Sequence, residues 1–213
     1  MQTMRTVICS TPGKLTDLTI TDAASPPCPD DRIRVAVKAC GLNFVDALFV
    51  QGGYQIKPPP PFTPGSELAG EIVEVGSGVN DFALGDRVFA SVGLGGFTSE
   101  VVLSPRQLTR IPDNISYAQA ATLGQSYATA WYTLTRRTNV GPGDWVVSLG
   151  AAGGVGSAVL DVARHLGAQT AAAASSDERL AACAAWAPTA DTPGPKTPAV
   201  SHVSPSPGGG TSG

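Results

Sequence analysis

Alternating polar and apolar positions dominate the first half of the chain. The clearest run, residues 32–39, keeps this alternation over a full strand length, as expected for a strand with one buried face. A loop leading into a short helix is predicted at 41–49. The glycines and prolines that follow this segment end the helix. Turn residues separate three further predicted strands, at 71–75, 87–90 and 97–103. Several short strands at this spacing predict a compact β-barrel or sandwich.

After residue 112, the apolar residues recur at the spacing of a helix. Asn114 or Ser116 is predicted to cap the first of these helices. The predicted elements are helices at 117–123 and 126–134, a strand at 145–149, a helix ending near 167, a strand at 169–174 and a helix from 177 to 183. The last four elements are expected to form a βαβ unit with a further helix.

A glycine-rich turn separates the strand at 145–149 from the helix that follows it. This helix carries its apolar residues on one face and ends at Gly167, where a terminating residue belongs. The spacing Ala151-x-Gly153-x-x-Gly156 matches the dinucleotide-binding fingerprint with alanine in place of its first glycine. Gly153 would let the backbone approach a pyrophosphate, and Gly156 would let the helix pack closely on the strand. The turn is therefore interpreted as a nucleotide site at a helix N-terminus.

Composition and charge exclude several classes of protein function. The 213 residues carry a formal net charge of −3 and no basic patch, which argues against a nucleic-acid partner. No apolar run approaches the roughly 20 residues that span a bilayer, and the N-terminus lacks a secretory signal pattern. We therefore expect a cytoplasmic protein without a membrane partner. The four cysteines, Cys9, Cys28, Cys40 and Cys183, are scattered, which argues against a disulfide framework and a clustered zinc site.

Several glycine-containing motifs follow one another in a linked order. They are Gly65-Ser66-Glu67-Leu68-Ala69-Gly70-Glu71-Ile72-Val73, Val75-Gly76-Ser77-Gly78-Val79 and Gly85-Asp86-Arg87-Val88. In this order they resemble the medium-chain dehydrogenase/reductase superfamily. Gly41-Leu42-Asn43-Phe44-x-Asp46, Gly53-Tyr54 and the turn at 150–156 are similar to its zinc-free quinone oxidoreductase branch. The resemblance covers roughly residues 4–183.

The resemblance implies an α/β fold that includes a β-barrel. A GroES-like catalytic domain is expected at 1–125 and an incomplete Rossmann (parallel, doubly wound) domain at 126–183. Residues 184–213 consist mainly of Ala, Pro, Thr, Ser and Gly, and disorder is predicted for them because they bury too little apolar surface. Because this composition begins inside a predicted helix, we expect a truncated or frame-shifted product. Family members are typically homodimers, and much of that interface would be missing.

The resemblance also implies that no metal is bound. Zinc-dependent members of the superfamily supply Cys, His and Cys to a catalytic zinc, and the matching positions here are Asn43, Ser66 and Gln125. None of these is a good zinc ligand. Without a Lewis acid an ordinary ketone is a poor hydride acceptor, whereas quinones and α,β-unsaturated carbonyls accept hydride readily. The implied activity is NADPH-dependent reduction of a small quinone or enone.

Four polar residues match the active-site cleft of the family: Asn43, Asp46, Tyr54 and Gln125. Tyr54 is expected to donate a hydrogen bond or proton to the reduced oxygen. Asn43 is expected to orient either the nicotinamide ribose or the substrate. Alternatively, Asn43 and Asp46 only cap the short helix, and Tyr54 only closes a Gly-Gly turn.

The implied cofactor is NADP(H). NAD enzymes carry Asp or Glu about 20 residues past the glycines, whereas Ser175 and Ser176 stand there in this chain, followed by Arg179, which suits a 2′-phosphate. Asp177 is either a counter-argument or the N-cap of the next helix. Thr129 matches a cofactor-contacting position of relatives, or is only a mid-helix threonine. The predicted cofactor-binding residues are Asn43, Thr129, Ala151, Ala152, Gly153, Gly154, Val155, Gly156, Ser175, Ser176 and Arg179.

Three functions stay open at this point. The first is a quinone or enone reductase, and the second is an enoyl-thioester reductase of the same superfamily, acting on acyl-CoA or acyl-carrier-protein substrates. The third is an inactive nucleotide-binding fragment. A Rossmann half with two strands would leave parallel edges unpaired and apolar faces uncovered, which favours the third possibility.

Overall fold

Two compact units make up the chain, Met1–Gln125 and Ser126–Gly213. The computed structural model describes residues 3–185 and 199–201. The boundary between the units lies within helix α3 (Leu123–Tyr132). Within the described ranges, no helix is long and apolar enough to cross a membrane.

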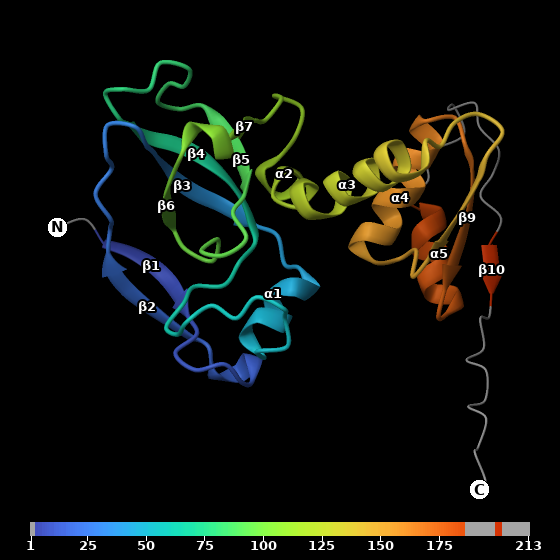
Figure 1. Ribbon diagram of the computed structural model, residues 1–213, viewed down its shortest axis with the longest axis horizontal. Coiled ribbons are helices and arrows are strands. Elements are labelled where there is room, and N and C mark those ends of the chain that lie inside the picture. Colours follow the sequence, from blue (N-terminus) through green and yellow to red (C-terminus); the bar gives the residue numbers. More distant parts are fainter. Residues whose placement is uncertain (1–2, 186–198, 202–213) are drawn as a thin grey trace, which may run out of the picture. The chain divides into compact units, whose positions relative to one another are not determined.

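A five-stranded antiparallel sheet forms the main part of the first unit, with the strand order β6-β3-β4-β5-β7. Figure 1 shows β4 lying between β3 and β5. The strands are β3 (Ile33–Cys40), β4 (Glu67–Val75), β5 (Arg87–Ser91), β6 (Glu100–Leu103) and β7 (Thr109–Arg110). Apolar side chains from neighbouring strands, among them Ile33, Leu68 and Val88, are fully buried together and form the core of the sheet.

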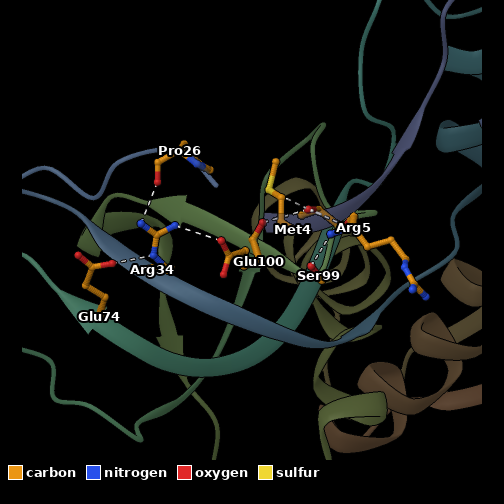
Figure 2. A network of polar contacts seen from close by, with 8 residues as sticks. Met4, Arg5, Pro26, Arg34, Glu74, Ser99 and Glu100 are labelled. Atoms are coloured by element: carbon orange, nitrogen blue, oxygen red, sulfur yellow. Dashed lines mark hydrogen bonds and ion pairs between the residues drawn. The ribbon is translucent and has the colours of Figure 1, made fainter. Parts of the chain in front are cut away.

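One buried polar residue departs from the predicted alternation along β3. Arg34 is only 5% exposed, although it lies between the apolar residues Ile33 and Val35. Its guanidinium donates from Nε to Glu74 at 2.7 Å, from one terminal nitrogen to Glu100 at 3.3 Å, and from the other to the Pro26 carbonyl at 2.8 Å. Figure 2 shows Arg34 reaching the two carboxylates on opposite sides. This network joins β3 to β4 and β6 in place of an apolar contact.

Shorter elements complete the first unit. They are β1 (Thr3–Ile8), η1 (Leu15–Asp17), β2 (Thr19–Ala24), α1 (Phe44–Val50), η2 (Pro105–Gln107) and α2 (Tyr117–Ala120). β1 and β2 form a separate antiparallel pair. Of the two predicted caps for α2, Ser116 is the one used, because its Oγ accepts the Gln119 N–H at 3.2 Å.

The helices near the boundary differ from the prediction in length. α2 ends at Ala120, whereas a helix to residue 123 was expected, and α3 begins at Leu123 instead of 126. The backbone N–H of Gln125, in the first turn of α3, donates to the Glu67 carboxylate at 2.9 Å. A buried acceptor on β4 therefore supports an earlier helix start, which the local sequence did not indicate. Residues Thr133–Thr138 continue from α3 as the π-helix η3.

The second unit contains a parallel sheet with the order β10-β9-β8. Its elements are β8 (Trp145–Leu149), α4 (Gly154–His165), β9 (Gln169–Ala174), α5 (Asp177–Ala185) and β10 (Ala199–Ser201). The strands β8 and β9 have the predicted bounds. The predicted apolar face of α4 is buried, with Ala163 fully enclosed beside Val162, and Gly167 follows the helix with a φ of 84°. α4 therefore connects two parallel strands, as the βαβ prediction required.

The predicted tail, residues 184–213, lies mostly outside the described residues. Where the structure describes it, the expectation of disorder does not hold: α5 extends to Ala185, and Ala199–Ser201 pairs in parallel with β9. A parallel edge strand offers unpaired backbone groups, and even a short segment without a hydrophobic pattern satisfies them. Such pairing depends on backbone hydrogen bonds rather than on side chains, so composition did not reveal it.

On one face of β8, apolar side chains stay exposed. Trp145, Val147 and Leu149 alternate along the strand and are 55%, 58% and 73% exposed. This exposure agrees with the expectation that part of the domain's apolar surface is uncovered.

Candidate functional site

The first group of predicted site residues lies at the start of α1. Asn43 is the N-cap of this helix, and its backbone N–H donates to Asp46 Oδ2 at 2.8 Å. The helix-capping alternative therefore holds for Asp46. Asp46 is nonetheless only 5% exposed, which is unusual for a capping carboxylate.

Burial determines the charge properties of Asp46. Desolvation raises the pKa of its carboxyl above the usual aspartate value, while the Asn43 N–H and the nearby polar groups of Ser66 and Gly65 act in the opposite direction. Its second oxygen, Oδ1, has no hydrogen-bond partner among the described residues. The site thus holds a carboxylate whose charged form is incompletely stabilised.

This raised pKa leads to a stability prediction with a definite sign. In the pH range between the unfolded value, about 3.9, and the higher native value, the native chain binds more protons than the unfolded chain. We therefore expect the free energy of unfolding of the wild type, relative to Asp46→Asn, to fall as the pH rises through this range and then to level off. Urea denaturation at a series of pH values measures the difference.

Asp86 provides a control of opposite sign. The Ala83 N–H and Arg110 lower the pKa of Asp86, so the wild type should gain stability over Asp86→Asn as the pH rises through its range. If the stability differences for Asp46→Asn and Asp86→Asn changed in the same direction with pH, the raised pKa of Asp46 would be contradicted.

A buried carboxylate brings three other site residues together. Asn43 Nδ2 donates to Glu67 Oε1 at 2.8 Å and to Ser66 Oγ at 3.2 Å. The other oxygen of Glu67 accepts the Gln125 backbone N–H at 2.9 Å. Asn43, Ser66 and Gln125, the three positions that correspond to zinc ligands in the resemblance, therefore meet around Glu67. Glu67 was missed from the sequence, although a carboxylate directly before the apolar pair Leu68-Ala69 was the available signal.

Two neighbouring residues, Tyr54 and Cys40, make other contacts. Tyr54 packs its ring on Phe49, with centroids 4.6 Å apart, and belongs to an apolar cluster with Cys9 and Phe62. Among the described residues it makes no hydrogen bond with Asn43, Asp46 or Gln125. Cys40 donates from Sγ to the Gly96 carbonyl at 2.8 Å, and burial raises the pKa of its thiol to about 11. The Cys40 thiol is therefore neutral at physiological pH.

Metal-ligating side chains do not gather in this region. Throughout residues 3–185 and 199–201, no group of three or more His, Cys, Asp or Glu side chains is arranged to hold a metal ion.

The second group of predicted residues forms the turn between β8 and α4. Gly150 has a φ of 67°, which favours glycine, and its carbonyl accepts the Gly153 N–H at 2.9 Å. A Cβ at Gly156 would lie 2.4 Å from the Gly150 oxygen and 2.9 Å from Ala151 Cα. Gly156 therefore permits the close contact of helix and turn that the fingerprint requires. Ser148, which was not predicted, fastens the strand to the helix by donating to the Gly156 carbonyl at 3.0 Å.

This turn fits a dinucleotide phosphate. α4 begins at Gly154, and its N-cap Gly153 provides no side-chain acceptor for the first N–H groups. Those groups point toward the N-terminal side of a twelve-residue helix, where an anion is favoured. Ala151 and Ala152 add no bulky side chain, and Val155 is 44% exposed.

The third group lies at the end of β9 and the start of α5. Ser175, Ser176 and Arg179 are all exposed. Ser176 Oγ accepts the Arg179 N–H at 3.3 Å, so Ser176 is the N-cap of α5. The alternative that Asp177 is the N-cap is wrong, because Asp177 is the first residue inside the helix. Thr129 is exposed on α3, and its carbonyl accepts the Thr133 hydroxyl at 2.8 Å.

Comparison with known proteins agrees with both halves of this description. The alcohol dehydrogenase GroES-like domain matches residues 29–113. A quinone oxidoreductase-like protein 2 homolog from Nematostella vectensis is 42% identical over 178 residues, which are 83% of this chain and 48% of that protein. Polyketide synthase GfsB from Streptomyces halstedii is 45% identical over 166 residues, 77% of this chain and 3% of that protein.

Solved structures show the same relationship. The quinone oxidoreductase from Thermus thermophilus, which was also determined with NADPH, superimposes with a TM-score of 0.75 at 32% identity, covering 85% of this chain and 57% of that one. The CurK enoyl reductase superimposes with a TM-score of 0.77 at 29% identity, covering 84% and 57%.

Fold, motif order and relatives together define the class. The chain belongs to the medium-chain dehydrogenase/reductase superfamily, a superfamily of oxidoreductases, and combines a GroES-like domain with part of a Rossmann domain. Within the superfamily, its relatives include quinone oxidoreductase-like proteins and enoyl reductases. The chain spans about half the length of the quinone oxidoreductase-like relatives it matches, 48% and 47% for two of them.

Proposed function

We propose that this chain carries the active-site and cofactor-binding residues of an NADPH-dependent reductase of quinones or α,β-unsaturated carbonyls that uses no zinc. The observation that carries the proposal is the turn at 150–156, where Gly156 lets α4 begin directly against the Gly150 backbone. A small-molecule substrate and a nicotinamide cofactor are consistent with the named relatives.

The residues of the second unit would hold NADPH at two points. The backbone of Ala151–Gly156 would bind the pyrophosphate at the N-terminus of α4. Ser175, Ser176 and Arg179 would bind the 2′-phosphate, since the exposed guanidinium and hydroxyls are donors for an anion. Thr129, which is exposed on α3, would contact the remainder of the cofactor. When bound, NADPH supplies the hydride.

The residues of the first unit favour a substrate that needs no Lewis acid. Asn43, Ser66 and Gln125 offer amide and hydroxyl groups where zinc-dependent relatives have cysteine and histidine, so the site is matched to hydrogen bonding. A quinone or conjugated enone already accepts hydride without metal assistance. Tyr54 would supply a hydrogen bond or proton to the reduced oxygen from its hydroxyl, although its ring packs on Phe49 in the apolar cluster.

The proposal is tested by mixing the chain with NADPH and, separately, p-quinones, short enones and an enoyl-CoA, and following NADPH oxidation. Turnover of quinones or enones is expected. Turnover of enoyl-CoA alone would favour the second candidate, an enoyl-thioester reductase, for which the likeness to CurK and to a polyketide synthase is the specific observation. NADPH binding without turnover would indicate a nucleotide-binding fragment, and absence of both would contradict all three.

The choice of NADPH over NADH gives a sharper prediction. Arg179→Ala is expected to raise the dissociation constant for NADPH about tenfold while leaving that for NADH nearly unchanged, because only NADPH carries the 2′-phosphate. Fluorescence titration of both nucleotides measures this. Arg137→Ala, another exposed arginine of the same unit, is the matched control. Equal effects of Arg179→Ala on both nucleotides would refute the assignment.

A further inference from the structure

The second unit contains a cavity of about 200 Å³ that the proposed function does not use. Three helices line it, through Tyr127 of α3, Cys183 of α5 and one face of α4. The α4 residues recur at intervals of three and four positions, as residues on one helix face do, and they are Ser157, Leu160, Asp161 and Arg164. All of these lining residues belong to the second unit.

The lining is apolar at its deep end and polar at its mouth. Leu160 is 2% exposed and Cys183 is 5% exposed, so these two side chains form the floor. Tyr127 and Asp161 are exposed, and the Tyr127 hydroxyl donates to Asp161 Oδ2 at 3.0 Å. A cavity of this kind fits a small molecule that is apolar at one end and carries an oxygen at the other.

Cys183 differs from the other three cysteines of the chain. Each of those thiols donates to a backbone carbonyl, and burial is the main reason that the pKa of each is raised. The donor and acceptor pairs are Cys9 with Thr11, Cys28 with Pro29, and Cys40 with Gly96. Because the thiolate is the nucleophile, a raised pKa makes these three cysteines less reactive. Among the described residues, Cys183 has no such acceptor, and its side chain lines the cavity.

We propose that this cavity is a covalent binding site for short α,β-unsaturated ketones, in which Cys183 adds to the conjugated double bond. The thiol first loses its proton to water, and the sulfur then bonds to the β-carbon while the π electrons move to the carbonyl oxygen. The resulting enolate takes a proton from water at its α-carbon. This addition has no leaving group and requires neither an oxidant nor NADPH, so it is separate from hydride transfer.

Arg164 gives the cavity its preference for an enone. The residue is half-buried in the cavity wall, and a guanidinium offers several N–H donors in one plane. Negative charge develops on the carbonyl oxygen during the addition, and a charge-assisted hydrogen bond from the guanidinium stabilises it. An alkylating agent that places no charge on an oxygen gains nothing from this contact.

The test is to incubate the full chain with 2-cyclohexen-1-one, without nucleotide, and to follow each cysteine by peptide mass spectrometry. Cys183 is expected to react at least about tenfold faster than Cys9, Cys28 or Cys40. In urea this difference should disappear. If Cys28, which is less buried than Cys183, reacts as fast as Cys183 in the native chain, the proposal is overturned.

A variant that fills the cavity tests the route to the thiol. Ser157→Phe should slow the reaction of Cys183 about tenfold, because a ring then occupies the space beside the floor. His165→Phe is the matched control, since His165 is exposed on the same helix and does not line the cavity. Hydrogen exchange of α4 verifies that the variants are folded. An unchanged rate in folded Ser157→Phe would show that the cavity is not the site.

Arg164→Met tests the preference for an enone and leaves the cavity open, so it decides the proposal if Ser157→Phe does not fold. It should slow the addition of 2-cyclohexen-1-one about tenfold while leaving alkylation of Cys183 by iodoacetamide nearly unchanged. Equal slowing of the two reagents, or no slowing of either, would overturn the role of the guanidinium and with it the assignment of an enone site.

Discussion

Arg34→Met is expected to destabilise the first unit by about 3–5 kcal/mol, because it removes one partner of a buried ion pair. Glu100, only 8% exposed, would lose the guanidinium at 3.3 Å, and the Pro26 carbonyl would lose its donor. Burial alone would lower the pKa of Arg34, but the hydrogen bond and charge of Glu74, with the charge of Glu100, raise it overall. The guanidinium is therefore charged at any pH that the folded chain tolerates.

An exposed ion pair on the same strand provides the control for Arg34→Met. Lys38 and Glu71 are 3.8 Å apart with side chains 46% and 41% exposed, so Lys38→Met should cost less than about 1 kcal/mol. Arg34→Met/Glu100→Met should recover much of the lost stability, since a buried pair replaced by apolar residues is often neutral. Amide hydrogen exchange of β3 and β4 measures the stability of all three variants. Equal costs for Arg34→Met and Lys38→Met would refute the role of the network.

Gly156→Val is expected to have the largest effect in the second unit. A Cβ at this position would lie 2.4 Å from the Gly150 oxygen, so the turn and α4 must separate. Such overpacking costs about 1–3 kcal/mol, and it displaces the N–H groups proposed to bind the pyrophosphate. We expect NADPH affinity to fall about 10- to 100-fold, measured by fluorescence titration. The stability loss is measured separately by hydrogen exchange of β8 and α4 in the nucleotide-free chain.

Gly141→Ala is the matched control for Gly156→Val, because no atom lies within 4 Å of the added Cβ. Gly156→Ala should fall between the two, since the first added carbon already produces the close contact. If Gly156→Val retained wild-type stability, the tight packing of α4 on the turn would be incorrect. If stability fell while NADPH affinity did not, the turn would not be the phosphate site.

The site could be predicted from the sequence only where its residues are contiguous in the chain. The turn at 150–156 was predictable because strand, glycines and helix are contiguous in the chain. The contact between Asn43 and Glu67 was not, because these residues are 24 positions apart and meet only when β4 pairs with β3. Tyr54 matches the family's cleft by position, yet its ring packs on Phe49, because side-chain direction depends on the surrounding core.

The amino-acid sequence by itself determined the β-rich first half, the βαβ unit and the superfamily. These follow from periodicity and contiguous motifs, which hydrophobic burial and backbone geometry enforce locally. Only the tertiary structure decided that Arg34 is buried, that Glu67 accepts a hydrogen bond from Asn43 and that Ala199–Ser201 pairs with β9. Each of these depends on groups far apart in the chain, which satisfy one another's charges or hydrogen bonds once folding removes water from them.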